Sequence, residues 1–134
     1  MTSVAPMKKN ILIIDDNPDT LEILRLVFQG EGYTVETASD GETGLEKAME
    51  GKAGIVLLDM MLPKMNGIEL CRRLKEDEAT RRVPIIIITA KSDFEARQGA
   101  IASGADAYLL KPFDPIEMVE RVKKMLENRP SASP

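Results

Sequence analysis

The chain has 134 residues, of which 30% are charged and 43% hydrophobic, and its net charge at pH 7 is −4. This length suits a single globular domain. The acidic balance gives no positive surface for nucleic acid or for an anionic membrane, so we expect neither as a direct partner. No apolar run approaches the roughly 18 residues that a membrane span needs. The N-terminus lacks the pattern of a signal peptide, and we therefore expect a cytoplasmic protein.

Two residue counts exclude further classes of site. Cys71 is the only cysteine, so an intramolecular disulfide is impossible, as suits a reducing compartment. The chain has no histidine. It can therefore form neither a histidine-ligated metal site nor a catalytic triad that needs histidine, and any phosphohistidine must belong to a partner.

Strand patterns recur along the chain. We expect strands at residues 11–14, 33–38, 55–58, 85–88 and 108–110. The continuous aliphatic runs among them are typical of parallel strands buried on both faces, whereas residues 33–38 alternate and should lie nearer an edge.

A helix-start signal follows each expected strand. The signals are Asn17-Pro18, Asp40-Gly41, Asn66-Gly67, Ser92 with Glu95, and Asp114-Pro115 with Glu117. Strict alternation of strands and helices predicts an α/β fold with a doubly wound parallel sheet and five flanking helices. We expect one domain at residues 9–128. Residues 1–8 should be a flexible tail, and 129–134 a flexible tail or a truncated linker.

Side chains able to handle phosphate follow four of the strands. Asp15 and Asp16 follow the first, Asp59 the third, Thr89 the fourth and Lys111 the fifth. The carboxyl ends of parallel strands share one edge of the sheet, where open α/β sheets bind ligands. Three carboxylates there repel one another unless a divalent cation or an amine relieves them. Oxygen ligands suit Mg²⁺, and Mg²⁺ with an amine suits phosphoryl transfer.

Several motifs in order resemble the response-regulator receiver domains of two-component signalling. They are Asp15-Asp16, Leu58-Asp59-Met60-Met61-Leu62-Pro63 with Gly67, Thr89-Ala90, Gly104-Ala105-Asp106-Ala107-Tyr108, and Lys111-Pro112-Phe113. The resemblance implies a flavodoxin-like fold with strand order 2-1-3-4-5 over roughly residues 9–128. It also implies a signalling module rather than an enzyme, although one that catalyses its own phosphorylation and slow autodephosphorylation.

The same resemblance implies a role for each site residue. Asp59 would accept a phosphoryl group from a histidine kinase or a histidine phosphotransfer protein. Asp16 and Asp59 would ligate Mg²⁺ (or Mn²⁺), with Asp15 close by and the Met61 carbonyl as a further ligand. Lys111 would pair with the phosphoryl oxygens, and the Lys111-Pro112 peptide would be cis.

A switch is also implied by the resemblance. Thr89 would move toward the phosphoryl group and Tyr108 would rotate into the vacated space. The surface of the fourth helix, fifth strand and fifth helix would then be read by an effector protein or an output domain. Ala107 replaces an acidic residue of the branch that dimerises through this surface, so the resemblance implies a monomer or a weak phosphorylation-dependent dimer.

Plainer interpretations stay open for single residues. Asp15 and Asp16 could cap the following helix, Thr89 could merely end its strand, and Tyr108 could be a half-buried strand aromatic. For the whole chain, the alternatives are a pseudo-receiver that acts as a protein-binding scaffold without phosphorylation, and a haloacid-dehalogenase-like Mg²⁺ phosphatase. Haloacid-dehalogenase-like phosphatases usually have a second Asp two residues after the nucleophilic Asp, where this chain has Met61 after Asp59.

Overall fold

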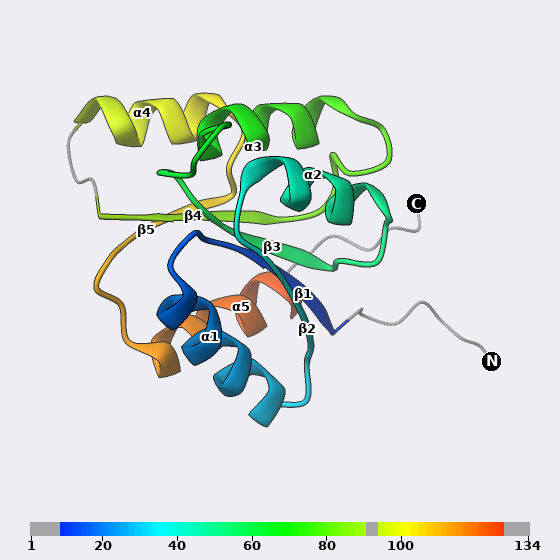
Figure 1. Ribbon diagram of the computed structural model, residues 1–134, viewed down its shortest axis with the longest axis vertical. Helices are drawn as coiled ribbons and strands as arrows, with labels where there is room; N and C mark the ends of the chain where they lie inside the picture. The colour runs from blue at the N-terminus through cyan, green and yellow to red at the C-terminus, as the bar shows by residue number, and fades with distance from the viewer. Residues whose placement is uncertain (1–8, 91–93, 128–134) are drawn as a thin grey trace.

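The computed structural model describes residues 9–90 and 94–127, which form one five-stranded parallel sheet with helices on both faces (Figure 1). The strands are β1 (Asn10–Ile14), β2 (Thr34–Ala38), β3 (Ile55–Asp59), β4 (Ile85–Thr89) and β5 (Ala107–Leu110). The helices are α1 (Pro18–Gly30), α2 (Gly41–Met49), α3 (Gly67–Glu76), α4 (Phe94–Ala102) and α5 (Pro115–Glu127). The strand order is β2-β1-β3-β4-β5, which confirms the flavodoxin-like fold.

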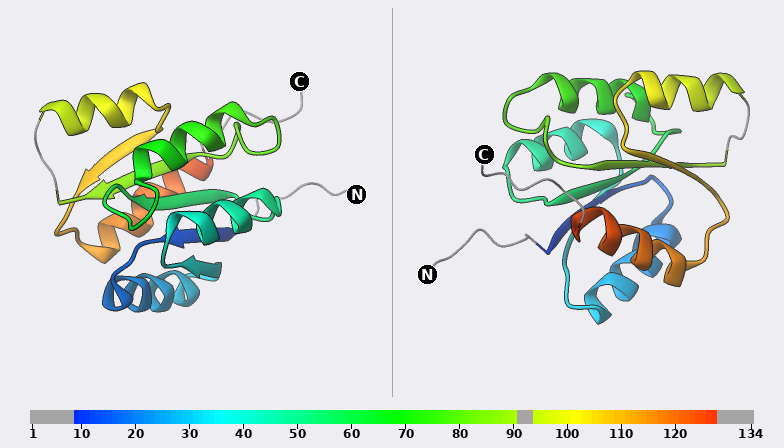
Figure 2. Two further views of the ribbon diagram at one scale, coloured as in Figure 1. Left: turned by 45° about the horizontal axis from the view of Figure 1, so that its top comes forward. Right: turned by 180° about the vertical axis from the view of Figure 1, so that it is seen from behind.

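Alternate residues of each strand belong to two separate hydrophobic cores, one on each face of the sheet. In β1, Ile11 and Ile13 pack toward α1 and α5, whereas Leu12 and Ile14 pack toward α2, α3 and α4. Figures 1 and 2 show these two helical layers on opposite faces of the sheet. All residues of β3 and β4 are buried, whereas β2 is only partly buried and lies at an edge, as its alternating pattern predicted.

Side-chain caps begin three of the helices at the predicted residues. The side-chain oxygens of Asn17, Asp40 and Asn66 accept backbone N–H groups at the starts of α1, α2 and α3. At α5, Asp114 Oδ1 accepts the Ile116 N–H at 2.9 Å. The predicted capping residue Ser92, and the predicted tails 1–8 and 129–134, lie outside the described residues. Of the helices in the described part, none is both long and apolar enough to cross a bilayer.

Lys75 connects several elements near the amino-terminal ends of β4 and β5, at the end of the sheet opposite the predicted site. Its Nζ donates to Arg81 O at 3.3 Å, Val83 O at 3.0 Å and Asp106 Oδ2 at 2.9 Å. The same Asp106 oxygen accepts the Ile85 N–H at 2.8 Å. One ammonium group therefore joins α3, the loop before β4 and the segment before β5.

We expect Lys75→Met to lower the free energy of unfolding by about 1–3 kcal/mol, the usual cost of losing hydrogen bonds to a charged group. The matched control is Lys52→Met, because the Lys52 side chain is 62% exposed and its Nζ lies 3.7 Å from Glu50. A surface lysine of this kind should change stability by less than about 0.5 kcal/mol. Urea denaturation of both variants measures the difference, and equal midpoints would contradict the role given to Lys75.

Candidate functional site

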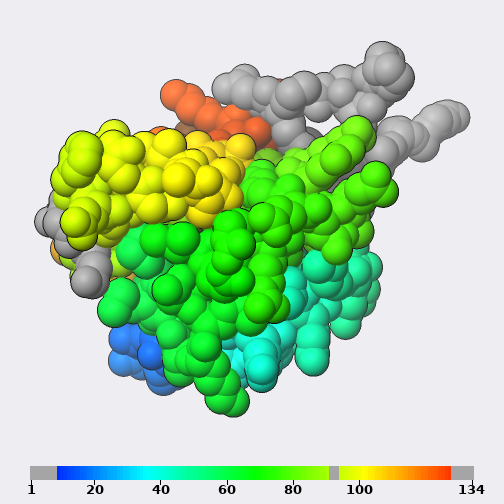
Figure 3. Space-filling model, turned by 90° about the horizontal axis from the view of Figure 1, so that it is seen from above, coloured from blue at the N-terminus to red at the C-terminus, as the bar shows by residue number. Residues whose placement is uncertain are grey.

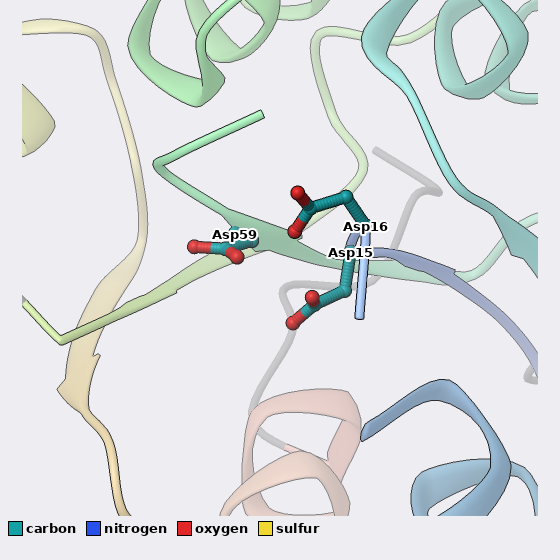
Figure 4. Close-up of side chains that lie close together, drawn as sticks. All are labelled: Asp15, Asp16 and Asp59. Atoms are coloured by element: carbon teal, nitrogen blue, oxygen red, sulfur yellow. The ribbon is translucent and has the colours of Figure 1, made fainter. Parts of the chain in front are cut away.

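Three aspartates meet where β1 and β3 end. The register pairs Ile14 with Leu58, so Asp15, which follows β1, and Asp59, the last residue of β3, lie at the same level of neighbouring strands. Each of Asp15, Asp16 and Asp59 offers a carboxylate oxygen within 4.8 Å of the others. Figure 4 shows Asp15 and Asp16 extending from the end of β1 beside Asp59. Asp15 and Asp59 are buried, whereas Asp16 is exposed, so the cluster opens to solvent on one side.

Lys111 brings a positive charge to this cluster from the segment after β5. Its Nζ lies 2.9 Å from Asp15 Oδ2 and 3.3 Å from Asp59 Oδ2. The backbone also holds Lys111 in place, since its N–H donates to Thr89 O at 2.8 Å and ties this segment to the end of β4. The Lys111-Pro112 peptide is cis, as the family resemblance implied.

Backbone amides orient the two buried carboxylates. Asp15 Oδ1 accepts the Asn17 N–H at 2.9 Å, and Asp59 Oδ1 accepts the Met61 N–H at 3.1 Å. The second oxygen of each carboxylate is left to face Lys111. The alternative that the aspartates cap α1 is wrong, because the cap oxygen belongs to Asn17.

Burial and charge shift the pKa values of two of these groups. Burial raises the pKa of Asp59 above its ordinary value. The negative charge of Asp15 adds to this rise, and the Met61 N–H and Lys111 oppose it. For Lys111, burial lowers the pKa, but the hydrogen bond and charge of Asp15, followed by the charge of Asp59, outweigh it and the pKa is raised. The site thus holds a protonated lysine beside the Asp59 carboxyl group, whose ionisation is opposed by burial and by the charge of Asp15.

The remaining predicted residues surround this centre. Thr89 is fully buried at the end of β4. Met61 lies two residues after Asp59, and 53% of its surface is exposed to solvent. Tyr108 lies in β5 opposite Ile87 and is half-buried, where it packs against the core on the α2–α4 face. The structure therefore brings the aspartates and Lys111 into one contact group, with Thr89 at the end of the neighbouring strand.

Sequence reasoning did not anticipate how tightly the segment after Asp59 is folded. The Gly67 N–H donates to Met60 O at 2.8 Å, and a Cβ at Gly67 would stand 2.4 Å from Asp59 O. Only glycine fits this close approach of backbone to backbone. Lys64 has a φ of 74°, in the left-handed region, although nothing in the sequence marks it for that conformation.

Comparison with known proteins assigns this arrangement to a family. Residues 11–123 match the model of the response regulator receiver domain. The chain belongs to this family. Response regulator ArlR of Staphylococcus saprophyticus is 42% identical over 120 residues, which cover 90% of this chain and 53% of that protein. The receiver domain thus spans about half the length of the curated relatives it matches.

Two solved structures are similar throughout the fold. A CheY-like receiver domain protein from Methanospirillum hungatei has a TM-score of 0.85 and 31% identity, covering 90% of this chain and 94% of that one. The receiver domain of a sensor histidine kinase from Pseudomonas aeruginosa has a TM-score of 0.82 and 28% identity, covering 89% of this chain and 98% of that one. The latter structure holds a magnesium ion coordinated in the active-site cleft.

The acidic cluster of this receiver domain fits a hard divalent cation. Its donors are all carboxylate oxygens, and they lie close enough together to share one ion. Oxygen donors with water access on one side suit Mg²⁺, which keeps part of its hydration shell, and Mn²⁺ accepts the same ligands. Among the described residues, Lys111 is the cation that contacts the buried Asp15 and Asp59, so a divalent cation there would further relieve the repulsion between the two carboxylates.

The raised pKa of Asp59 gives a testable dependence of stability on pH. Because this pKa is higher in the folded state than in the unfolded one, the folded state binds more protons between the two values. Without divalent cations, stability should therefore fall as pH rises from the ordinary aspartate pKa through the raised value. Asp59→Asn should remove this contribution and stabilise the domain at pH 7.

Urea denaturation in a chelator, from about pH 4 to pH 8, measures this difference. We expect the stability of Asp59→Asn relative to wild type to grow as pH rises from the ordinary aspartate pKa to the raised pKa, and to level off above it. A constant difference between the two proteins at every pH would contradict the cause assigned to the pKa of Asp59.

Proposed function

We propose that this receiver domain is a phosphoacceptor, in which Asp59 takes a phosphoryl group from the phosphohistidine of a histidine kinase or a histidine phosphotransfer protein. One observation carries the proposal. The buried Asp59 carboxylate is held by the Met61 N–H at one oxygen and by Lys111 Nζ at the other, beside the acidic pair Asp15-Asp16. A carboxylate fixed in this way is oriented for attack on phosphorus.

The chain's own residues divide the work of this transfer. A carboxylate oxygen of Asp59 forms the new bond to phosphorus while the bond from phosphorus to the donor nitrogen breaks. Lys111 pairs with the phosphoryl oxygens as negative charge spreads over them. Asp16 and Asp59, with Asp15 nearby and the Met61 carbonyl, would hold Mg²⁺ or Mn²⁺. The bound cation supplies further neutralisation of phosphoryl charge.

The domain's output follows from the added charge at this edge. A phosphoryl group brings roughly two negative charges. Thr89 is the last residue of the neighbouring strand β4, and its hydroxyl would hydrogen-bond the phosphoryl group. We propose that Thr89 moves toward the phosphoryl group and that Tyr108 rotates into the space it vacates. This movement would shift the α4–β5–α5 surface between two conformations. An effector protein or an output domain would read that surface. The domain would be a monomer or a weak phosphorylation-dependent dimer.

In this role the domain is a cytoplasmic signal transducer rather than an enzyme acting on a separate substrate. Its catalysis is limited to its own phosphorylation and to slow hydrolysis of its acyl phosphate. The acidic cluster favours this role over a pure scaffold, because closely placed carboxylates destabilise a fold that does not use them.

Intact mass after incubation with acetyl phosphate tests the proposal. We expect one added phosphoryl group per chain when Mg²⁺ is present and none when it is chelated. The proposal would be contradicted by a protein that gains no phosphoryl group and whose nitrogen–proton spectrum does not change when beryllofluoride and Mg²⁺ are added. That result would favour the scaffold alternative. Repeated turnover of a phosphate ester would instead indicate a phosphatase.

A further inference from the structure

The loop between β3 and α3, residues 60–66, contains a tight turn. Lys64 adopts a φ of 74°, and the Met65 N–H donates to Pro63 O at 2.8 Å, which closes a γ-turn around Lys64. This left-handed form is uncommon for a residue other than glycine and needs surrounding contacts to hold it.

One contact comes from the first residue of α2. A Cβ at Gly41 would stand 2.8 Å from Met65 Cβ and 2.9 Å from Met65 O. Neither atom can swing aside, because one is the first side-chain carbon and the other belongs to the backbone. Gly41 is itself buried, and the Met65 side chain packs on the core of this face. Figure 3 shows the green surface that follows β3 bordering the cyan surface of α2 directly.

The same loop reaches the phosphoacceptor through Met61. The Met61 N–H holds Asp59 Oδ1 at 3.1 Å, while Lys111 lies beside Oδ2. At its other end the loop is anchored by Gly67, whose N–H bonds Met60 O. Because Gly67 is fixed, the backbone between Met61 and Met65 has to take up any displacement of Met65.

We infer that Gly41 is a positioning residue for phosphorylation of Asp59. Its missing Cβ lets Met65 seat against α2, which keeps the Met61 N–H aimed at the carboxylate. A larger residue pushes the loop outward and turns or frees Asp59. Gly41 is not one of the site residues, and its effect is transmitted through Met65 and Met61. The inference rests on the proposed phosphoacceptor function.

The test compares Gly41→Ala with Ala48→Gly, a control in the same helix. Ala48 is buried in α2, and its replacement weakens the helix by about 1 kcal/mol without adding an atom near the loop. The readouts are the Met61 amide signal in nitrogen–proton spectra of Mg²⁺-free protein and the rate of phosphorylation by acetyl phosphate. For Gly41→Ala we expect a moved Met61 signal and a rate roughly tenfold to hundredfold lower. For Ala48→Gly, both should match wild type at a temperature where all proteins are folded.

A folded Gly41→Ala variant with the wild-type Met61 signal and rate would overturn the inference, as would equal losses in Ala48→Gly. If Gly41→Ala does not fold, Met65→Gly is the second variant. It removes the Met65 side chain that lies against Gly41, so it should move the Met61 signal and slow phosphorylation. A Met65→Gly variant indistinguishable from wild type would also overturn it. The amide signal needs no phosphodonor, so it tests the positioning even if wild-type protein proves not to be phosphorylated.

Discussion

Asp59→Asn should not be phosphorylated at all by acetyl phosphate and Mg²⁺ under conditions that fully modify the wild-type domain. The amide nitrogen of asparagine is not a nucleophile toward phosphorus, and its oxygen carries no charge. The variant should also bind Mg²⁺ more weakly, because one of the three clustered carboxylates is gone. Intact mass gives the first quantity, and calorimetric titration gives the second.

Asp77→Asn is the matched control for this substitution. Asp77 follows α3 at the opposite end of the domain, and its side chain accepts the Ala79 N–H at 2.8 Å, a bond that asparagine can also make. We expect wild-type modification and Mg²⁺ affinity in this variant. A phosphoryl group on Asp59→Asn in the wild-type amount would show that another residue is the acceptor.

Lys111→Met should lower the phosphorylation rate by about 100-fold to 1,000-fold, the usual effect of removing a group that stabilises charge in the transition state. It should also lower stability without Mg²⁺ by about 2 kcal/mol, because Asp15 and Asp59 lose the ammonium that contacts both. Mg²⁺ affinity should change in the opposite direction. With the competing cation removed, the carboxylates are expected to bind Mg²⁺ more tightly.

These opposed effects separate charge stabilisation from general damage to the site. A merely misfolded site would lose Mg²⁺ binding and phosphorylation together. Lys124→Met, an exposed lysine of α5, should leave the rate and the Mg²⁺ affinity as in wild type. Weaker Mg²⁺ binding in Lys111→Met would contradict the account of Lys111 as the cation that neutralises these aspartates.

The sheet and the convergence of the site could be predicted because they depend on patterns local to each strand. The run Ile55–Leu58 indicates a strand buried on both faces, and the polar residue that follows it must lie at the carboxyl edge. The same logic places Asp15 and Lys111 at that edge, and the structure confirms that they meet Asp59. Helix starts at Asn17 and Asn66 follow equally local capping rules.

The folding of the β3–α3 loop could not be predicted in this way, because it depends on contacts between distant segments. The left-handed φ of Lys64 has no local signal such as glycine or asparagine. Gly41 looks like an ordinary helix-start glycine until Met65 is found against it. Sequence also left open whether Asp15 caps a helix or faces Asp59, a choice decided by the Asn17 side chain.

The most direct test of the central claim is to locate the phosphoryl group chemically. Wild-type domain is incubated with acetyl phosphate and Mg²⁺ and then treated with borohydride, which reduces an aspartyl phosphate to homoserine. Peptide fragmentation by mass spectrometry reads the position of the converted residue. We predict homoserine at position 59 alone. Conversion at another aspartate, such as Asp15 or Asp16, or phosphorylated protein with no converted residue, would contradict the assignment of Asp59 as the phosphoacceptor.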